Sequence, residues 1–217
     1  MKGPSWKVET GRRDGRVSNI TEALTNLIPP TANITQLKSG FQQRGLSVKD
    51  LVVLSGMFEC QIYKDFDDIW KLTRLIHSSY YLGGHTLGTS HCSSFSSRLY
   101  NFSGKGDTDP DLDPNYIAKL KNKCKQGDAN SLVEMDPGSF KTFDESYYTL
   151  VGKRRGLFVS DAALLDDSET KAYVKLQATT HGSTFFEDFG VSMIKMGRIG
   201  VLTGSSGEIR KECALVN

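Results

Sequence analysis

Two separated stretches of the chain decide its fold: Asp50-Leu-Val-Val-Leu-Ser-Gly56 and Gly84-His-Thr-Leu-Gly-Thr-Ser-His-Cys92. Ser47 and Asp50 stand three positions apart, as in a helix capping box with Asp in place of the usual Glu, and an apolar run follows at 51–54. This pattern predicts a short apolar helix that begins near Ser47. The second stretch is rich in glycine and carries His85, whose imidazole is a common metal ligand.

The two stretches join into one continuous motif when residues 57–83 are left out. The joined motif resembles the proximal haem-ligand signature of the plant secretory (class III) haem peroxidases, and the resemblance covers nearly all of residues 3–56 and 84–217. It implies an all-α haem-peroxidase fold, mostly its proximal half, with residues 1–217 as one partial peroxidase domain. It also implies that His85 is the axial ligand of a haem b iron and that Asp161 accepts a hydrogen bond from the other ring nitrogen.

Residues 57–83 match nothing in that family. Gly56-Met57 can be encoded with a splice-donor string and Leu82-Gly83 with an acceptor string, and removing residues 57–83 preserves the reading frame. We therefore interpret the segment as a retained intron. The alternative is a true insertion that forms a helix, because residues 66–82 carry apolar residues at roughly helical spacing. Either way, we expect an insert at this point to detach His85 from the helix that precedes it.

The resemblance further implies one calcium site on the proximal side, while the family's distal site lies in a segment that this sequence does not match. Calcium takes roughly six to eight hard oxygen ligands. The implied ligands are Thr86, Asp136, Ser139, Thr142 through its carbonyl, and Asp144. The resemblance also pairs Cys92 with Cys124, leaves Cys213 without its partner, and places Pro29 in the segment that gives substrates access to the haem edge. Zinc is an alternative for His85, His91, Cys92 and Cys124, but their spacing matches no zinc template.

The function implied by the resemblance is oxidation of phenolic donors by hydrogen peroxide, in peroxide catabolism and the response to oxidative stress. Cleavage of peroxide needs a distal base and a cation that stabilises the leaving oxygen. The sequence contains no Arg-x-x-x-His-Asp-Cys-like stretch, so it offers no distal catalytic pair. The alternative is therefore a non-catalytic peroxidase fragment with weak or no haem binding.

Composition and sequence motifs bear on nucleic-acid binding, membrane spanning and secretion. The chain has 217 residues, 38% hydrophobic and 24% charged, with a net charge of +2, so no basic stripe favours nucleic acid. No apolar stretch is long enough to span a membrane, and the N-terminus lacks the apolar region of a signal peptide. Three N-glycosylation sequons begin at Asn19, Asn33 and Asn101 and favour an extracellular protein. The family likewise implies an extracellular or vacuolar monomer.

Caps and apolar spacing predict the remaining helices. Asp113-Pro114 forms an N-cap followed by a proline at the first helical position, and Asp161 and Ser168 are candidate N-caps. The final helix is expected to bury Phe186, Phe189, Met193 and Met196 on one face. The predicted helical ranges are 18–27, 33–44, from 47 through the apolar run, 93–103 as helix or irregular turn, 113–124, 144–155, the segments after 161 and 168, and 183–196.

Overall fold

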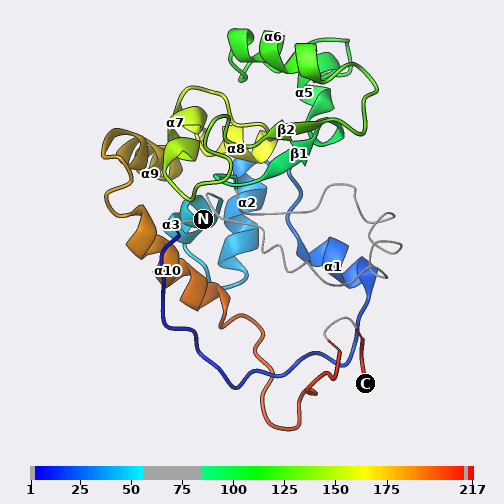
Figure 1. The fold of residues 1–217 in the computed structure, drawn as a ribbon, viewed down its shortest axis with the longest axis vertical. Coiled ribbons are helices and arrows are strands. Elements are labelled where there is room, and N and C mark those ends of the chain that lie inside the picture. Colours follow the sequence, from blue (N-terminus) through cyan, green and yellow to red (C-terminus); the bar gives the residue numbers. More distant parts are fainter. Residues whose placement is uncertain (1–2, 56–84, 213–214) are drawn as a thin grey trace.

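The structure is a computed structural model that describes residues 3–55, 85–212 and 215–217. It is mainly α-helical, which confirms the predicted fold class (Figure 1). The helices are α1 (Ile20–Asn26), α2 (Ile34–Gln42), α3 (Val48–Ser55), α5 (Ser96–Tyr100), α6 (Pro114–Lys123), α7 (Ser146–Gly152), α8 (Val159–Ala163), α9 (Ser168–Thr179) and α10 (Phe185–Met196). The inserted segment 57–83 and Cys213, for which we predicted an intron origin and an unpaired thiol, lie outside the described residues.

Polar side chains fix the starts of several helices, those of α3 and α6 as predicted. The Ser47 hydroxyl accepts from the amide of Asp50 at 3.1 Å, and the Asp50 carboxylate accepts from the amide of Ser47 at 2.8 Å, so α3 begins with a complete capping box. The side chain of Asn33 caps α2, and that of Asp113 caps α6 ahead of its first-turn proline. These caps satisfy amides that have no partner within the helix.

Two predicted caps are wrong by a few residues. Asp161 is the third residue of α8, and it reaches back to accept a hydrogen bond from the amide of Phe158 at 2.8 Å. Ser168 is the first residue of α9, which is capped by Asp167 through the amides of Glu169 and Thr170. Adjacent Asp and Ser residues are both good caps, so local sequence does not separate them.

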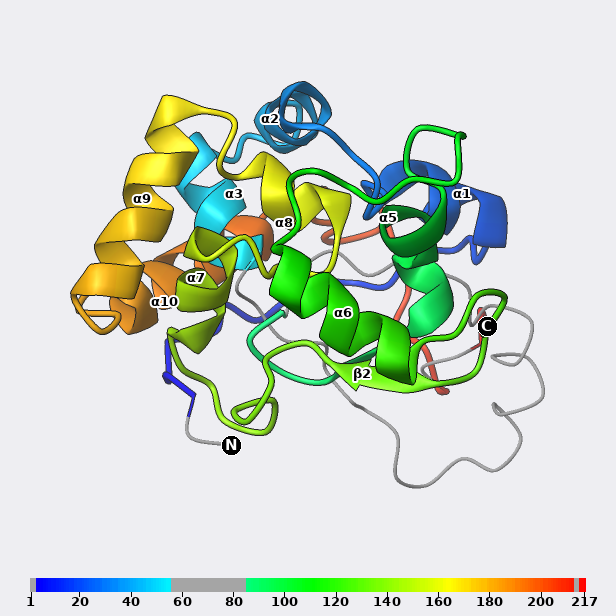
Figure 2. The same ribbon diagram turned by 90° about the horizontal axis from the view of Figure 1, so that it is seen from above.

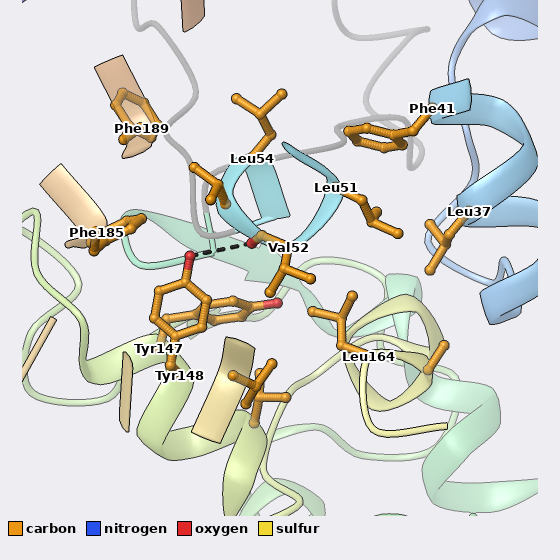
Figure 3. Packing of buried hydrophobic residues seen from close by; sticks show 14 of the residues in the cluster. Leu37, Phe41, Leu51, Val52, Leu54, Tyr147, Tyr148, Leu164, Phe185 and Phe189 are labelled. Atoms are coloured by element: carbon orange, nitrogen blue, oxygen red, sulfur yellow. Dashed lines mark hydrogen bonds between the residues drawn. The ribbon is translucent and has the colours of Figure 1, made fainter. Parts of the chain in front are cut away.

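Helix α3 lies at the centre of the larger hydrophobic core. The four residues at 51–54 are all buried, as expected of a helix that is apolar on every side. Helices α2, α9 and α10 pack against α3, and α7 packs against α9. Figure 3 shows the aromatic rings of this cluster around α3, with the hydroxyl of Tyr148 donating to the carbonyl of Val52 at 3.2 Å. This packing holds the described part of α3 in the core.

The buried face of α10 differs from the predicted one. Phe185 is fully buried, whereas Phe186 is 38% exposed. Phe189 is buried as predicted, and Met193 and Met196 pack against the core from partly buried positions. Phe185 precedes Phe189 by four positions and Phe186 precedes it by three, and both spacings place a residue near the face of Phe189. The packing of α10 buries Phe185 and leaves Phe186 partly exposed.

A second core cluster surrounds the Cys92–Cys124 disulfide, which is formed as predicted. Strands β1 (Thr89–His91) and β2 (Leu132–Glu134) pair antiparallel with Ser90 opposite Val133, and the 3-10 turn η1 (Cys92–Ser94) leads from β1 to α5. Both strands lie outside the helical ranges predicted from the sequence, and three residues are too few to show the alternation of a strand. The pair places the residues after His85 beside the loop that follows β2.

The extended N-terminal segment runs beside the C-terminal segment along one edge of the molecule (Figure 1). The amide of Arg13 donates to the carbonyl of Leu202 at 2.9 Å, and that of Asp14 donates to Glu208 at 2.8 Å. Among the described residues, no helix is long and apolar enough to cross a membrane.

Candidate functional site

His85 lies directly at the end of α3. Its backbone amide donates to the carbonyl of Ser55 at 3.4 Å, although residues 56–84 lie between them in the sequence. The prediction that the insert detaches His85 from its helix is therefore wrong. The physical reason is that the two flanks of the insert meet, and closing a longer loop between fixed ends adds little free energy.

Asp161 holds the imidazole of His85 from behind. The Nδ1 atom of His85 lies 2.5 Å from Oδ1 of Asp161, and both side chains are buried. The same carboxylate accepts from the Tyr147 hydroxyl at 2.9 Å and, through Oδ2, from the Phe158 amide at 2.8 Å. The structure thus brings together the two residues that the sequence paired, and adds two partners that the sequence analysis missed.

The charge state of Asp161 fixes the tautomer of His85. Burial favours the neutral carboxyl, but His85 and the hydrogen bonds from Phe158 and Tyr147 outweigh burial, so the pKa of Asp161 is lowered. An ionised carboxylate only accepts hydrogen bonds, so in the neutral form of the ring the single proton is on Nδ1. The lone pair is then on Nε2.

The Nε2 atom of His85 is buried and has no hydrogen-bond partner among the described residues. The rings of Phe158 and Tyr147 meet the imidazole edge-on, with centroids 4.8 Å and 5.7 Å away. A buried polar atom without a partner is costly unless something binds it. A neutral imidazole held at Nδ1 by a carboxylate, with Nε2 available, is the arrangement that metal-ligating histidines show, so these residues fit an iron ligand.

The predicted calcium ligands lie beside His85. The hydroxyl of Thr86 donates to the backbone carbonyl of Asp144 at 2.7 Å, and the hydroxyl of Ser139 donates to the Asp144 carboxylate. The amide of Thr142 donates to the carbonyl of Ser139 at 2.7 Å. The loop that follows β2 therefore reaches back to the residue next to His85.

Asp136 is a buried carboxyl group of this set with an oxygen atom that has no hydrogen-bond partner among the described residues. Asp136 is 2% exposed, and the oxygen atom without a partner within the described ranges is Oδ2. Burial, reinforced by the charges of Asp144, Glu134 and Glu145, raises the pKa of Asp136 to about 7. A bound cation would offset both the burial and the repulsion, so the buried oxygens fit a hard cation such as calcium.

Zinc does not fit this region. Two of the four candidate ligands, Cys92 and Cys124, are joined in a disulfide and offer no thiolate. Over residues 3–55, 85–212 and 215–217, no group of three or more His, Cys, Asp or Glu side chains is arranged to hold a metal ion. The zinc alternative is excluded by the disulfide.

Pro29 stands in the segment between α1 and α2. It lines an open cavity of about 430 Å³ between α1 and α2, whose described lining does not include His85. A second cavity of about 280 Å³ reaches α3 at Leu54 and Ser55. The amide of Ser160, which precedes Asp161, donates to the carbonyl of Pro30 at 2.9 Å, so the proline turn is tied to α8.

The fold and the site together define a helical protein built around one buried histidine whose ring is held by a carboxylate. Comparison with known proteins gives the family. The sequence model of the family described as "Peroxidase" matches residues 1–180, so the chain belongs to the peroxidase family.

Individual plant relatives agree with this assignment. Peroxidase 56 and Peroxidase 27 of Arabidopsis thaliana are 57% and 58% identical to the chain over all 217 residues. Peroxidase 1 of Oryza sativa subsp. japonica is 49% identical over 221 aligned positions, which cover the whole chain. The predicted resemblance to plant peroxidases is thereby confirmed. The chain spans 58% of the length of the first relative and 59% of the other two.

Proposed function

We propose that this chain provides the proximal half of a haem-dependent peroxidase, with His85 as the axial ligand of the iron of haem b. The observation that carries the proposal is the buried His85 side chain, bonded to Asp161 through Nδ1 while Nε2 has no partner among the described residues. Haem, when bound, supplies the redox chemistry by which hydrogen peroxide is reduced and donors are oxidised.

Asp161 has two tasks in this proposal. Its negative charge increases the electron density of the imidazole through the Nδ1–H bond, which makes Nε2 a stronger donor toward a ferric ion. Its other contacts, to the Tyr147 hydroxyl and the Phe158 amide, keep the carboxylate in one place. The ring of His85 is therefore held in a fixed orientation before any ligand binds.

Calcium would stabilise the same arrangement from the other side. Thr86 follows the iron ligand directly and is fully buried. Asp136, Ser139 and Asp144 with Thr86 would supply carboxylate and hydroxyl oxygens, and the Thr142 carbonyl would add one more. A cation at this point would tie the loop after β2 to the residue beside His85.

The whole protein's activity is proposed as oxidation of small phenolic donors by hydrogen peroxide, with roles in peroxide catabolism and oxidative stress. The 217 residues contain no distal Arg and His motif, so we assign ligand binding, and not peroxide cleavage, to the groups in this chain. Because this motif is absent, a non-catalytic fragment with weak or no haem binding is the second candidate.

A secreted location, extracellular or vacuolar, is part of the proposal. The three sequon asparagines, Asn19, Asn33 and Asn101, are all exposed. Each uses its side-chain oxygen to accept a backbone hydrogen bond, from Thr21, Gln36 and Gly106 respectively. Glycosylation modifies the amide nitrogen and leaves these hydrogen bonds in place. We further propose a monomer.

Titration of the purified chain with ferric haem tests the proposal. The original chain is compared with His85→Ala and with His181→Ala, whose histidine is 92% exposed and bonded to no buried group. We expect the original chain and His181→Ala to give the same histidine-ligated absorption spectrum, and His85→Ala to lose it. The same spectrum and affinity in His85→Ala would overturn the proposal. Peroxide-dependent oxidation of guaiacol by the chain alone would exclude the non-catalytic alternative.

A further inference from the structure

The position of Asp161 depends on the three residues that precede α8. The amide of Phe158 donates to Oδ2 of Asp161 at 2.8 Å, and the Phe158 ring packs edge-on against His85. Gly156 packs directly against the same side chain, because a Cβ atom at position 156 would lie 2.4 Å from Cβ and 3.2 Å from Cγ of Asp161. Any larger residue at 156 would push the carboxylate away from its present place.

These three residues are in turn held by a single buried side chain, Arg98 of α5. Its Nη1 atom lies 2.8 Å from each of the carbonyl oxygens of Gly156, Leu157 and Phe158. In both ribbon views α8 lies between α3 and α5 (Figures 1 and 2). Arg98 of α5 thus contacts the segment that leads into α8.

Arg98 itself is fixed by Asp109. Its Nε donates to Oδ2 of Asp109 at 2.6 Å, and both side chains are almost fully buried, at 1% and 2% exposure. The amide of Asp109 donates to the carbonyl of Arg98 at 2.9 Å, and the amide of Asp111 donates to the Asp109 carboxylate at 2.8 Å. The pair is therefore anchored through both its main chain and its side chains.

A buried ion pair contributes little net stability compared with an apolar pair of the same size. The planar guanidinium, by contrast, defines direction, because its donors have a fixed geometry. Here the guanidinium contacts three consecutive backbone carbonyls, which lie shortly before Asp161 in the chain. This use suggests a role in orientation rather than in stability alone.

We propose that Arg98 and Gly156 are positioning residues for His85: Arg98 fixes the 156–158 segment, Gly156 leaves room for Asp161, and Asp161 thereby reaches Nδ1 of His85. The relevance to catalysis rests on the proposed function, whereas the contact chain itself involves residues of this chain alone. Arg98 and Asp109 touch neither His85 nor its free nitrogen, so they act through Asp161.

The test is nuclear magnetic resonance of the 217-residue chain without haem, using ¹⁵N-labelled histidine. The proton on Nδ1 of His85 should give a downfield resonance that exchanges slowly with water, and His85→Gln assigns it. We expect Arg98→Lys and Gly156→Ala each to shift or remove this resonance. Ser192→Ala is the matched control, because it removes a buried hydrogen bond in the other core cluster. It should lower thermal stability and leave the resonance unchanged.

An unchanged resonance in folded Arg98→Lys and Gly156→Ala would overturn the proposal. Should Arg98→Lys not fold, Asp109→Asn decides, because it keeps the side-chain shape and removes the charge that holds Nε; a shift supports the proposal and no shift overturns it. The readout needs no haem, so it is independent of the proposed function. A moved resonance together with unchanged haem binding in His85→Ala would overturn the function and leave the positioning role intact.

Discussion

The backbone amide of His85 donates to the carbonyl of Ser55 at 3.4 Å, so the candidate iron ligand continues from the end of α3. The described residues on either side of the insert, Ser55 and His85, therefore lie next to each other. On the described side of this junction, Asp161 contacts both His85 and Tyr147.

Deletion of residues 57–83, which joins Gly56 to Gly84, should leave the His85 environment unchanged. Each doubling of the length of a flexible loop adds about 0.6 kcal/mol to the entropic cost of closing it. The deletion should therefore leave the free energy of unfolding equal or raise it by about 1–2 kcal/mol. Urea denaturation of both chains measures this difference. A large loss of stability, or loss of the His85 Nδ1 proton resonance, would show that the insert is structurally required.

Asp161→Asn should weaken iron ligation by His85. Asn keeps an oxygen near Nδ1 but removes the charge, and loss of such a partner typically lowers metal affinity roughly 10- to 100-fold. Competition titrations with ferric haem measure the change. Asp111→Asn is the control, because Asp111 is 61% exposed and lies outside the site. Equal affinity in both variants would contradict the role given to Asp161.

Calcium should stabilise the chain through Asp136. A ligand at 100 times its dissociation constant adds about 2.7 kcal/mol to the free energy of unfolding. We expect calcium to raise the melting temperature of the original chain, chelation to reverse the effect, and Asp136→Asn to abolish it. Ser139→Thr keeps the hydroxyl and should respond like the original chain. The site assignment fails if Asp136→Asn gains as much stability from calcium as the original chain does.

The free energy of unfolding should fall in acid because the Asp50 carboxylate becomes protonated. Burial raises the pKa of this carboxyl, but hydrogen bonds from Ser47, Ser192 and Lys195 outweigh it and lower the pKa to about 2. A lowered pKa stabilises the folded state above the unfolded value near 3.8, and that contribution disappears as the pH falls toward 2. The contribution is about 2 kcal/mol from the size of the shift. Asp50→Asn should lose the corresponding pH dependence, which acid titration of the unfolding free energy would reveal.

The Cys92–Cys124 disulfide should stabilise the half of the molecule that holds Arg98. It links cysteines 32 positions apart, and closing a loop of that size contributes about 4 kcal/mol. We expect the Cys92→Ala, Cys124→Ala double variant to have a free energy of unfolding that is lower by that amount. Urea denaturation of both chains measures the difference. A difference below about 1 kcal/mol would indicate that the second core cluster is stable without the bond.

The parts of the fold that local patterns encode could be predicted from the sequence. The Ser47–Asp50 capping box and the Asp113-Pro114 start are local, and they agree with the structure. The resemblance supplied His85 and Asp161, which lie far apart in the chain. The sequence predicted that Phe186 is buried, whereas the structure buries Phe185. Apolar spacing alone does not determine which of two neighbouring residues on a helix faces the core.

The contacts that complete the site had no local signal. Tyr147 meets Asp161, and the Phe158 ring meets His85, through the tertiary fold. Phe158 stands only three positions before Asp161, but a phenylalanine gives no side-chain signal of a cap, so the bond from its amide was not predicted. Arg98 reads as an ordinary surface charge, because arginine is mostly exposed, and its partner Asp109 lies in a loop eleven positions on. Ser55 and His85 are far apart in the sequence, so we predicted that they would be separated in space. The prediction was wrong because the two ends of a long loop can lie next to each other.

The most direct test of the account is the iron–histidine stretching band in the resonance Raman spectrum of the ferrous haem complex. The account predicts the band in the original chain, its loss in His85→Ala, and a shift to lower frequency in Asp161→Asn, because the imidazole becomes a weaker donor. A band that persists unchanged in His85→Ala would show that another residue binds the iron, and would contradict the central claim.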